Sequence, residues 1–290
     1  NFKEIVETYY KKPEGNKIKN PWGRELNYLS KTVVDLFKNE EGKNMVSTSD
    51  DADVPFVIEP YVDDRMFVHC LVSDGNLIPY NQVKYRDVTS IEKCGCMSLK
   101  ELYEFTFIDK DGGLSCQNRA ELEKDLEDVL YTRWIEYGTL QGITPYSMVC
   151  ITGAHKMVAD SVINPFLTIY KELVQLVLIQ RAAIIMFAEK AALLSYDLQR
   201  SKKREDDKDK SEVNVMDRIA ELQKDYVAFQ NQLQLFEVTS QLQGIELYHK
   251  LQEKMEIANQ EKEMEKQLQK LFEISQTEQG DKTNEIFNII

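Results

Sequence analysis

The chain has 290 residues, of which 42% are hydrophobic and 10% aromatic, so it carries enough apolar surface for a folded core and is not disordered throughout. Its 36 Lys and Arg against 49 Asp and Glu give a formal net charge of −13, which argues against nucleic-acid binding because phosphate contacts need clustered basic side chains. The five scattered cysteines follow neither a disulfide framework nor a paired CxxC zinc pattern, which favours a reducing compartment.

Residues 1–160 hold six of the seven prolines and alternate short apolar runs with turn signals. A tight turn, SDGN, separates two of these runs, and DKDGG separates two more. The predicted elements are strands at residues 65–72, 77–80, 103–108, 114–116 and 144–152, and a helix at residues 120–138. Alternating strands and helices predict an α/β or α+β domain.

The second half is predicted to be helical, with one long helix from the Asn164-Pro165 pair to about Gln199. The mixed charge run at 200–212 predicts a solvated connection at the tip of a helical hairpin. A heptad seam follows, which predicts a helix packed lengthwise on another. Its members are Ile219, Leu222, Tyr226, Phe229, Leu233 and Phe236.

A break is expected within residues 237–248, where Ser240 and Gln243 form a capping-box pattern that predicts a new helix start. If that helix runs to the end of the chain, ~45 residues make a rod of roughly 70 Å. Its stripe of Met264, Leu268 and Leu271 is thin, so the rod should bundle with neighbours or with copies of itself. We therefore expect a domain at 1–160, a helical hairpin at 161–240 and a stalk helix at 241–290.

Catalytic motifs are weak, and we expect no enzyme. Cys94 and Cys96 form C-x-C rather than C-x-x-C, and the three histidines fall in different predicted elements. The DKDGG turn resembles the start of a calcium loop, but Ala120 occupies the position that needs an acidic ligand. No stretch reaches the ~18–20 apolar residues of a membrane span, because charged and amide residues interrupt 172–196, and no signal peptide is visible.

The segment DKTNEIFNII (281–290) closely resembles the junction between the stalk helix and the first membrane helix of CorA-type magnesium channels. The segment VAFQNQLQLFEVTSQLQGIELYHKLQ (227–252) is similar to the hairpin-to-stalk turn of that family. The resemblance covers roughly residues 120–290. The family's Gly-Met-Asn loop and both membrane helices are absent, so we expect a cytoplasmic part that ends just inside the first span and does not itself conduct ions.

The resemblance implies a homo-oligomer, a pentamer in the full-length protein, at the cytoplasmic face of the cell membrane. Asn284 matches a pore-lining asparagine that binds the waters of hydrated Mg²⁺. Glu273 matches a stalk carboxylate at the pore mouth, and Glu246 and Glu253 lie with His249 near the stalk position of regulatory Mg²⁺ sites. Bound Mg²⁺ would hold a closed state, and the ion could equally be Co²⁺ or another divalent cation.

Two other interpretations of the chain's function remain open. The chain could be a coiled-coil scaffold with an α/β head and no ion function, which predicts metal-indifferent stability and an antiparallel helical bundle. It could also be a CorA-like relative with a signalling role that binds another ligand in its N-terminal domain.

Overall fold

The computed structural model of the chain describes residues 46–47, 56–57, 66–95, 97–109, 115–153, 158–201, 208–233 and 238–289. The chain divides into two compact units, Asn1–Met66 and Phe67–Ile290. In the first unit, β1 (Val46–Ser47) and β2 (Phe56–Val57) pair in parallel. The expected boundaries near residues 160 and 240 stay predictions.

The second unit is built around a mixed sheet with strand order β3-β6-β5-β4. Its strands are β3 (Val68–Ser73), β4 (Leu130–Tyr131), β5 (Thr139–Thr144) and β6 (Ser147–Thr152). β3 runs parallel to β6, whereas β4–β5 and β5–β6 are antiparallel pairs. Every residue of β5 and β6 is buried, so both faces of the sheet are covered.

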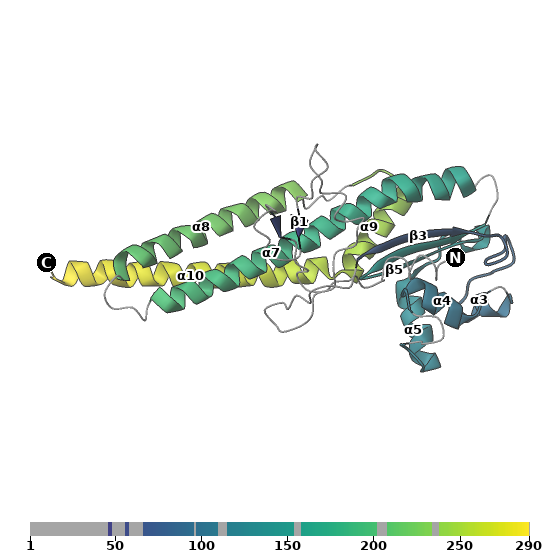
Figure 1. The fold of residues 1–290 in the computed structure, drawn as a ribbon, viewed down its shortest axis with the longest axis horizontal. Helices are drawn as coiled ribbons and strands as arrows, with labels where there is room; N and C mark the ends of the chain where they lie inside the picture. Colours follow the sequence, from purple (N-terminus) through teal and green to yellow (C-terminus); the bar gives the residue numbers. More distant parts are fainter. Residues whose placement is uncertain are drawn as a thin grey trace. The chain divides into compact units, whose positions relative to one another are not determined.

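One face of the sheet packs on α3 (Thr89–Lys93), α4 (Leu99–Thr106) and α5 (Arg119–Val129). Leu140 and Ile151 point to this side and join the core that contains Leu102 and Leu126. The opposite face presents Ile143, Met148 and Cys150 to the long helices. Figure 1 shows the short helices and the long helices on opposite sides of β3 and β5.

Several strand predictions in this unit were wrong. Residues 103–108 lie largely in α4, where Ser98 and Glu101 form a capping box and the buried residues Leu99, Leu102, Tyr103 and Thr106 follow a helical period. Residues 77–80 and 115–116 are in turns and irregular segments rather than strands. The helix predicted at 120–138 ends at Val129, and the chain then enters β4.

The predicted strand at 65–72 corresponds to β3, and that at 144–152 contains β6. The long helix expected after Pro165 is also present. It follows two π-helical turns, η2 (Ala159–Ile163) and η3 (Phe166–Tyr170), and continues as α7 (Lys171–Ser201).

The heptad seam lies on α8 (Lys208–Leu233), where Ile219, Leu222, Tyr226 and Phe229 are buried. Phe236 and residues 202–207 of the charged connection lie outside the described residues. α7, α8 and α10 (Ile257–Ile289) run side by side in Figure 1 and share one core.

The break before the last helices is present, but the expected capping box is not. α9 (Leu242–Lys254) begins after Gln241, whose backbone N–H donates to Thr239 Oγ1, and the N-cap side chain makes no capping hydrogen bond. Gly244 is in the first turn of α9, where an added Cβ would lie 2.6 Å from Thr239 Cγ2. The first turn of α9 therefore packs closely on Thr239 at a position where a larger residue would collide.

A continuous terminal rod was also expected, and this was wrong because the chain breaks between α9 and α10. Glu256 adopts a left-handed backbone with φ 54°. Met255 and Ile257 flank it and are 2% and 1% exposed. Residues two positions apart point to nearly opposite sides of a continuous helix, so the break allows both side chains to enter the core. Met264, Leu268 and Leu271 are buried on α10, as their spacing predicted.

The fold of this unit is thus α+β with a helical C-terminal region. Within the described residues, no helix is both long enough and apolar enough to cross a membrane.

Candidate functional site

The residues expected to handle a cation lie on the last two helices. Glu246 and Glu253 are on α9, and Glu273 and Asn284 are on α10. The backbone of Asn284 is helical, but its side chain lies outside the described part of the structure. In the described ranges of a single chain, no group of three or more His, Cys, Asp or Glu side chains is arranged to hold a metal ion.

Glu246 already has two protein donors. The Tyr131 hydroxyl donates to Glu246 Oε2, and Arg133 Nη1 lies 2.6 Å from Glu246 Oε1. The Arg133 and Glu246 side chains are 38% and 35% exposed. Tyr131 belongs to β4, so this carboxylate connects α9 to the edge of the sheet.

Burial and the hydrogen bond to Glu246 raise the pKa of Tyr131 well above its ordinary value. The Tyr131 hydroxyl therefore stays protonated at neutral pH and remains a hydrogen-bond donor. A carboxylate that already accepts from a phenol and a guanidinium has less capacity for a cation. The contacts of Glu246 with Tyr131 and Arg133 are therefore those of a structural connection between α9 and the sheet.

Glu253 is part of a charged cluster at the end of α9. The Lys254 ammonium lies 2.6 Å from Asp128 Oδ1 and 2.8 Å from Glu253 Oε1, and the Lys254 side chain is only 9% exposed. Burial disfavours the charged form of Lys254, but its hydrogen bonds to the two carboxylates outweigh this and raise its pKa. Lys250 Nζ donates to the Asp128 backbone carbonyl at 2.8 Å. The Glu253 side chain is 65% exposed, so much of it faces solvent.

Glu273 is exposed on α10 and accepts a 2.9 Å hydrogen bond from Gln269 Nε2. The opposite side of the helix carries the buried Leu268, Leu271 and Ser275. Glu273 therefore faces away from its own bundle. A neighbouring molecule could reach it without disturbing the core.

The two histidines among the described residues, His69 and His249, lie on different elements. His249 is exposed on α9, and its ring centroid lies 6.0 Å from that of Tyr248. His69 is on β3, stacked on Phe166 with ring centroids 4.0 Å apart. His155 lies outside the described residues.

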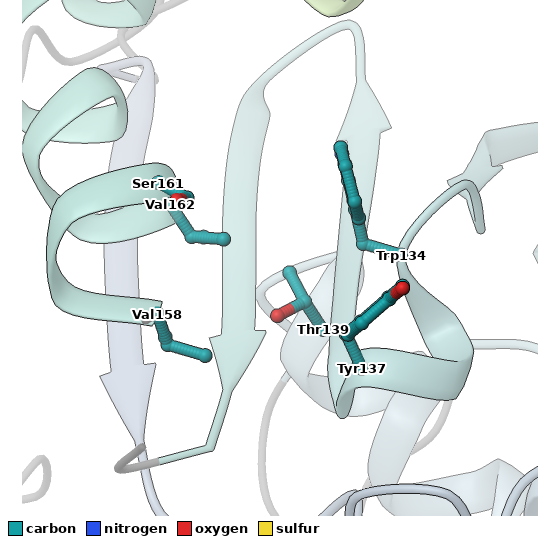
Figure 2. A pocket seen from close by; sticks show the side chains of 6 residues that line it. All are labelled: Trp134, Tyr137, Thr139, Val158, Ser161 and Val162. Atoms are coloured by element: carbon teal, nitrogen blue, oxygen red, sulfur yellow. The ribbon is translucent and has the colours of Figure 1, made fainter. Parts of the chain in front are cut away.

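A cavity of about 140 Å³ lies between η2 and the start of β5. Figure 2 shows Val158, Ser161 and Val162 on one side of it and Trp134, Tyr137 and Thr139 on the other. Thr139 Oγ1 is already 2.7 Å from Thr152 Oγ1. The lining is aromatic, aliphatic and hydroxylic without a carboxylate, so this cavity does not suit a cation.

A buried polar network joins α7 to α9. Gln180 Nε2 donates to the Leu233 carbonyl at 2.7 Å and lies 3.0 Å from the Tyr248 hydroxyl. Gln252 Nε2 lies 3.2 Å from Gln180 Oε1 and 3.0 Å from the same hydroxyl. Gln180 is fully buried, so this network fixes how α9 sits on α7.

Tyr131, Arg133 and Asp128 were not predicted as partners of the α9 side chains. These contacts join residues more than 110 positions apart, as with Arg133 and Glu246, which are 113 apart. Local spacing carries no signal for such pairs. No protein-family model, curated protein or solved structure matches this chain.

Proposed function

We propose that the chain is the cytoplasmic, cation-responsive part of a CorA-like divalent-cation channel or transporter. The likeness of residues 227–252 and 281–290 to the hairpin-to-stalk and stalk-to-membrane segments of that family supports this proposal. The observation that carries it is the two-sided character of α10. One side is buried through Met264, Leu268 and Leu271, while Glu273 is exposed on the other.

In this proposal, Mg²⁺ binds between copies of the chain. Carboxylate oxygens are suitable ligands for Mg²⁺, which also keeps several of its waters. The described part of a single chain brings no metal-binding group together, and in this proposal carboxylates of neighbouring copies form the site. Glu273, which faces away from its own bundle, is the first ligand candidate. Glu253 is the second, because it is 65% exposed although it pairs with Lys254 at 2.8 Å. Glu246 is held by Tyr131 and Arg133.

The assembly is a ring of identical chains, with α10 acting as the stalk that leads to a membrane span and Asn284 near the pore. In this proposal, α7 and α8 are the two helices of the hairpin beside the stalk. Bound Mg²⁺ screens carboxylates of adjacent copies and favours the closed ring, whereas at low Mg²⁺ the like charges repel. The ion shifts the equilibrium only by its difference in affinity between the two states.

Thermal unfolding of the 290-residue chain with and without millimolar MgCl₂ tests this proposal. A ligand present at ten times its Kd raises the unfolding midpoint by roughly 2–4 °C for a protein of this size. We expect such a shift for the native chain and a smaller one for Glu253→Gln and Glu273→Gln. Glu263→Gln is the matched control, because Glu263 is exposed on α10 but pairs with Lys266 of its own helix at 2.6 Å.

Ionic strength is matched with NaCl throughout, so that screening of the net charge is not mistaken for binding. A shift that NaCl reproduces, or one that Glu263→Gln reduces as much as Glu273→Gln does, would rule out the sensor role.

The second candidate is a scaffold with an α+β head and a helical bundle that has no ion function. The contact of Glu246 with Tyr131 and Arg133 favours it, since one of the three expected ligands serves to join α9 to the sheet. This candidate predicts identical melting curves with and without MgCl₂. The same experiment therefore separates the two functions.

A further inference from the structure

The solvent-facing side of α7 carries an apolar stripe that nothing in the described structure covers. Ile179, Met186 and Leu193 are spaced seven residues apart, and their side chains are 51%, 39% and 56% exposed. Tyr196 extends the stripe and is 61% exposed. Ala182 is exposed between Ile179 and Met186 and completes the three-and-four spacing of a heptad.

The opposite side of the same helix already packs in the core. Val177, Ile184, Phe187 and Leu194 are all buried there, in the core that α7 shares with α8, α9 and α10. A surface helix normally has one apolar face, and a helix that is apolar on both faces is normally buried on both. Exposed apolar stripes of this kind mark surfaces that bind another protein.

Charged residues in the stripe indicate the direction in which a partner helix runs. Glu172 and Arg200 lie four heptads apart at the two ends of α7, and both are exposed. Glu189 lies between them on the same face. If two copies of α7 packed in parallel, each of these three residues would meet its own copy and repel it.

In an antiparallel pair, Glu172 and Arg200 attract each other across the interface instead of repelling their own copies. With Met186 at the centre, Glu172 lies opposite Arg200 of the second copy, because both are 14 residues from Met186. Ile179 then lies opposite Leu193 of the second copy, since each is seven residues from the centre. Glu189 no longer meets its own copy, because the position opposite it is that of Ala183, which is uncharged and packs partly against its own core.

We propose that the outward stripe of α7 binds a second copy of this chain, antiparallel and with a two-fold axis at Met186. The interface is isologous, so each chain contributes the same residues to it. The apolar centre supplies the affinity, and the two Glu172–Arg200 pairs set the direction.

This proposal and the cation site are tested by different residues. Pairing involves α7, whereas cation binding involves Glu253 on α9 and Glu273 on α10, so failure of one proposal is distinguished from failure of the other. Because α7 and α10 belong to one bundle, pairing turns the two α10 helices in opposite directions. That is the antiparallel bundle expected of the scaffold candidate.

Sedimentation velocity of the full 290-residue chain over a range of concentrations tests the apolar centre. We expect a monomer–dimer equilibrium for the native chain. Met186→Lys places two like charges on the two-fold axis and should weaken the dimer by at least ~100-fold. Val227→Lys is the matched control, because Val227 is 49% exposed on α8, away from the stripe, and should leave the dimer unchanged.

A charge exchange tests the direction at low ionic strength. Glu172→Arg alone replaces both attractive pairs with repulsive ones and should weaken the dimer by about 10-fold. The double variant with Glu172→Arg and Arg200→Glu restores both pairs and should return the native affinity. In a parallel pair, each of these residues meets its own copy, so neither variant would change the dimer.

A native chain that stays monomeric, or one in which Val227→Lys disrupts the dimer as strongly as Met186→Lys, overturns the proposal. If a segment of the same chain covered the stripe, Met186→Lys would lower the unfolding midpoint of a monomer. That result also overturns it. Failure of the double variant to restore affinity overturns the antiparallel direction.

Discussion

Glu256 occupies a backbone conformation that suits glycine. Its φ of 54° lies in the left-handed region, which costs a non-glycine residue about 1 kcal/mol. It follows Met255, the C-cap residue of α9, at the position where glycine is the usual choice. We expect Glu256→Gly to raise the free energy of unfolding by about 0.5–1 kcal/mol, as measured by urea denaturation.

The same substitution inside a helix provides the control for Glu256→Gly. Glu263 is within α10, so Glu263→Gly should lower the free energy of unfolding by about 1 kcal/mol. Opposite effects of the two Glu→Gly substitutions on the free energy of unfolding would establish that the left-handed backbone at Glu256 causes the gain in stability. A loss of stability in both variants would contradict this account.

His69 makes the stability of the fold depend on pH. Burial, and secondarily the charge of Lys171, lower its pKa below the ordinary 6.5. As the pH falls below 6.5, the unfolded imidazole takes up a proton before the folded one does, so the free energy of unfolding decreases until the folded pKa is reached. His69 contributes its full share of stability above pH 6.5.

Urea denaturation at a series of pH values detects this titration. We expect His69→Gln to flatten the slope of unfolding free energy against pH just below pH 6.5 and to leave the lower range, where carboxylates titrate, unchanged. If the slope of unfolding free energy against pH is the same for the native chain and for His69→Gln, other titrating groups cause the pH dependence.

At the scale of the elements, the position of α9 depends on contacts with the sheet and with α7. Glu246 connects it to β4, and Gln252 connects it to Gln180 of α7. Tyr131→Phe removes the donor to Glu246 and should lower the free energy of unfolding by about 1 kcal/mol in metal-free buffer. Tyr137→Phe removes a hydroxyl from a 40% exposed side chain and should change it by less than about 0.5 kcal/mol.

A double-mutant cycle with Glu246→Ala completes this test, because alanine has no side-chain acceptor for the Tyr131 hydroxyl. If Glu246 is a structural connection, the effects of Tyr131→Phe and Glu246→Ala are not additive, because both remove the same hydrogen bond. Additive effects would show that the two residues act separately. Glu246 would then be available as a cation ligand.

At the scale of the whole molecule, two assemblies compete for the long helices. A ring around α10 needs the helices of all copies to point the same way, whereas pairing through α7 turns two of them in opposite directions. The net charge of −13 opposes any close approach of copies at low salt. Divalent cations would relieve this repulsion in a ring, and the Glu172–Arg200 pairs offset part of it in the dimer.

The expected elements were found where local periodicity is strong. The long helix after Pro165, the buried seam of α8 and the strand ending at Thr152 all follow from spacing and turn residues in a single segment. The heptad of Ile179, Met186 and Leu193 was equally visible in the sequence. Which face of α7 is exposed could not be known before its packing on α8 and α10 was described.

The sequence by itself determined an α+β chain with a helical second half, because the period of apolar residues selects the type of each element. The helix that contains residues 103–106 also had a local signal, the Ser98–Glu101 capping box, which the strand prediction overlooked. Only the tertiary structure decided that the terminal rod breaks at Glu256 and that Glu246 is bound by Tyr131 and Arg133. These two features depend on burial and on pairs distant in sequence. The free energy of such contacts exceeds local propensity and is not encoded by the spacing of neighbouring residues.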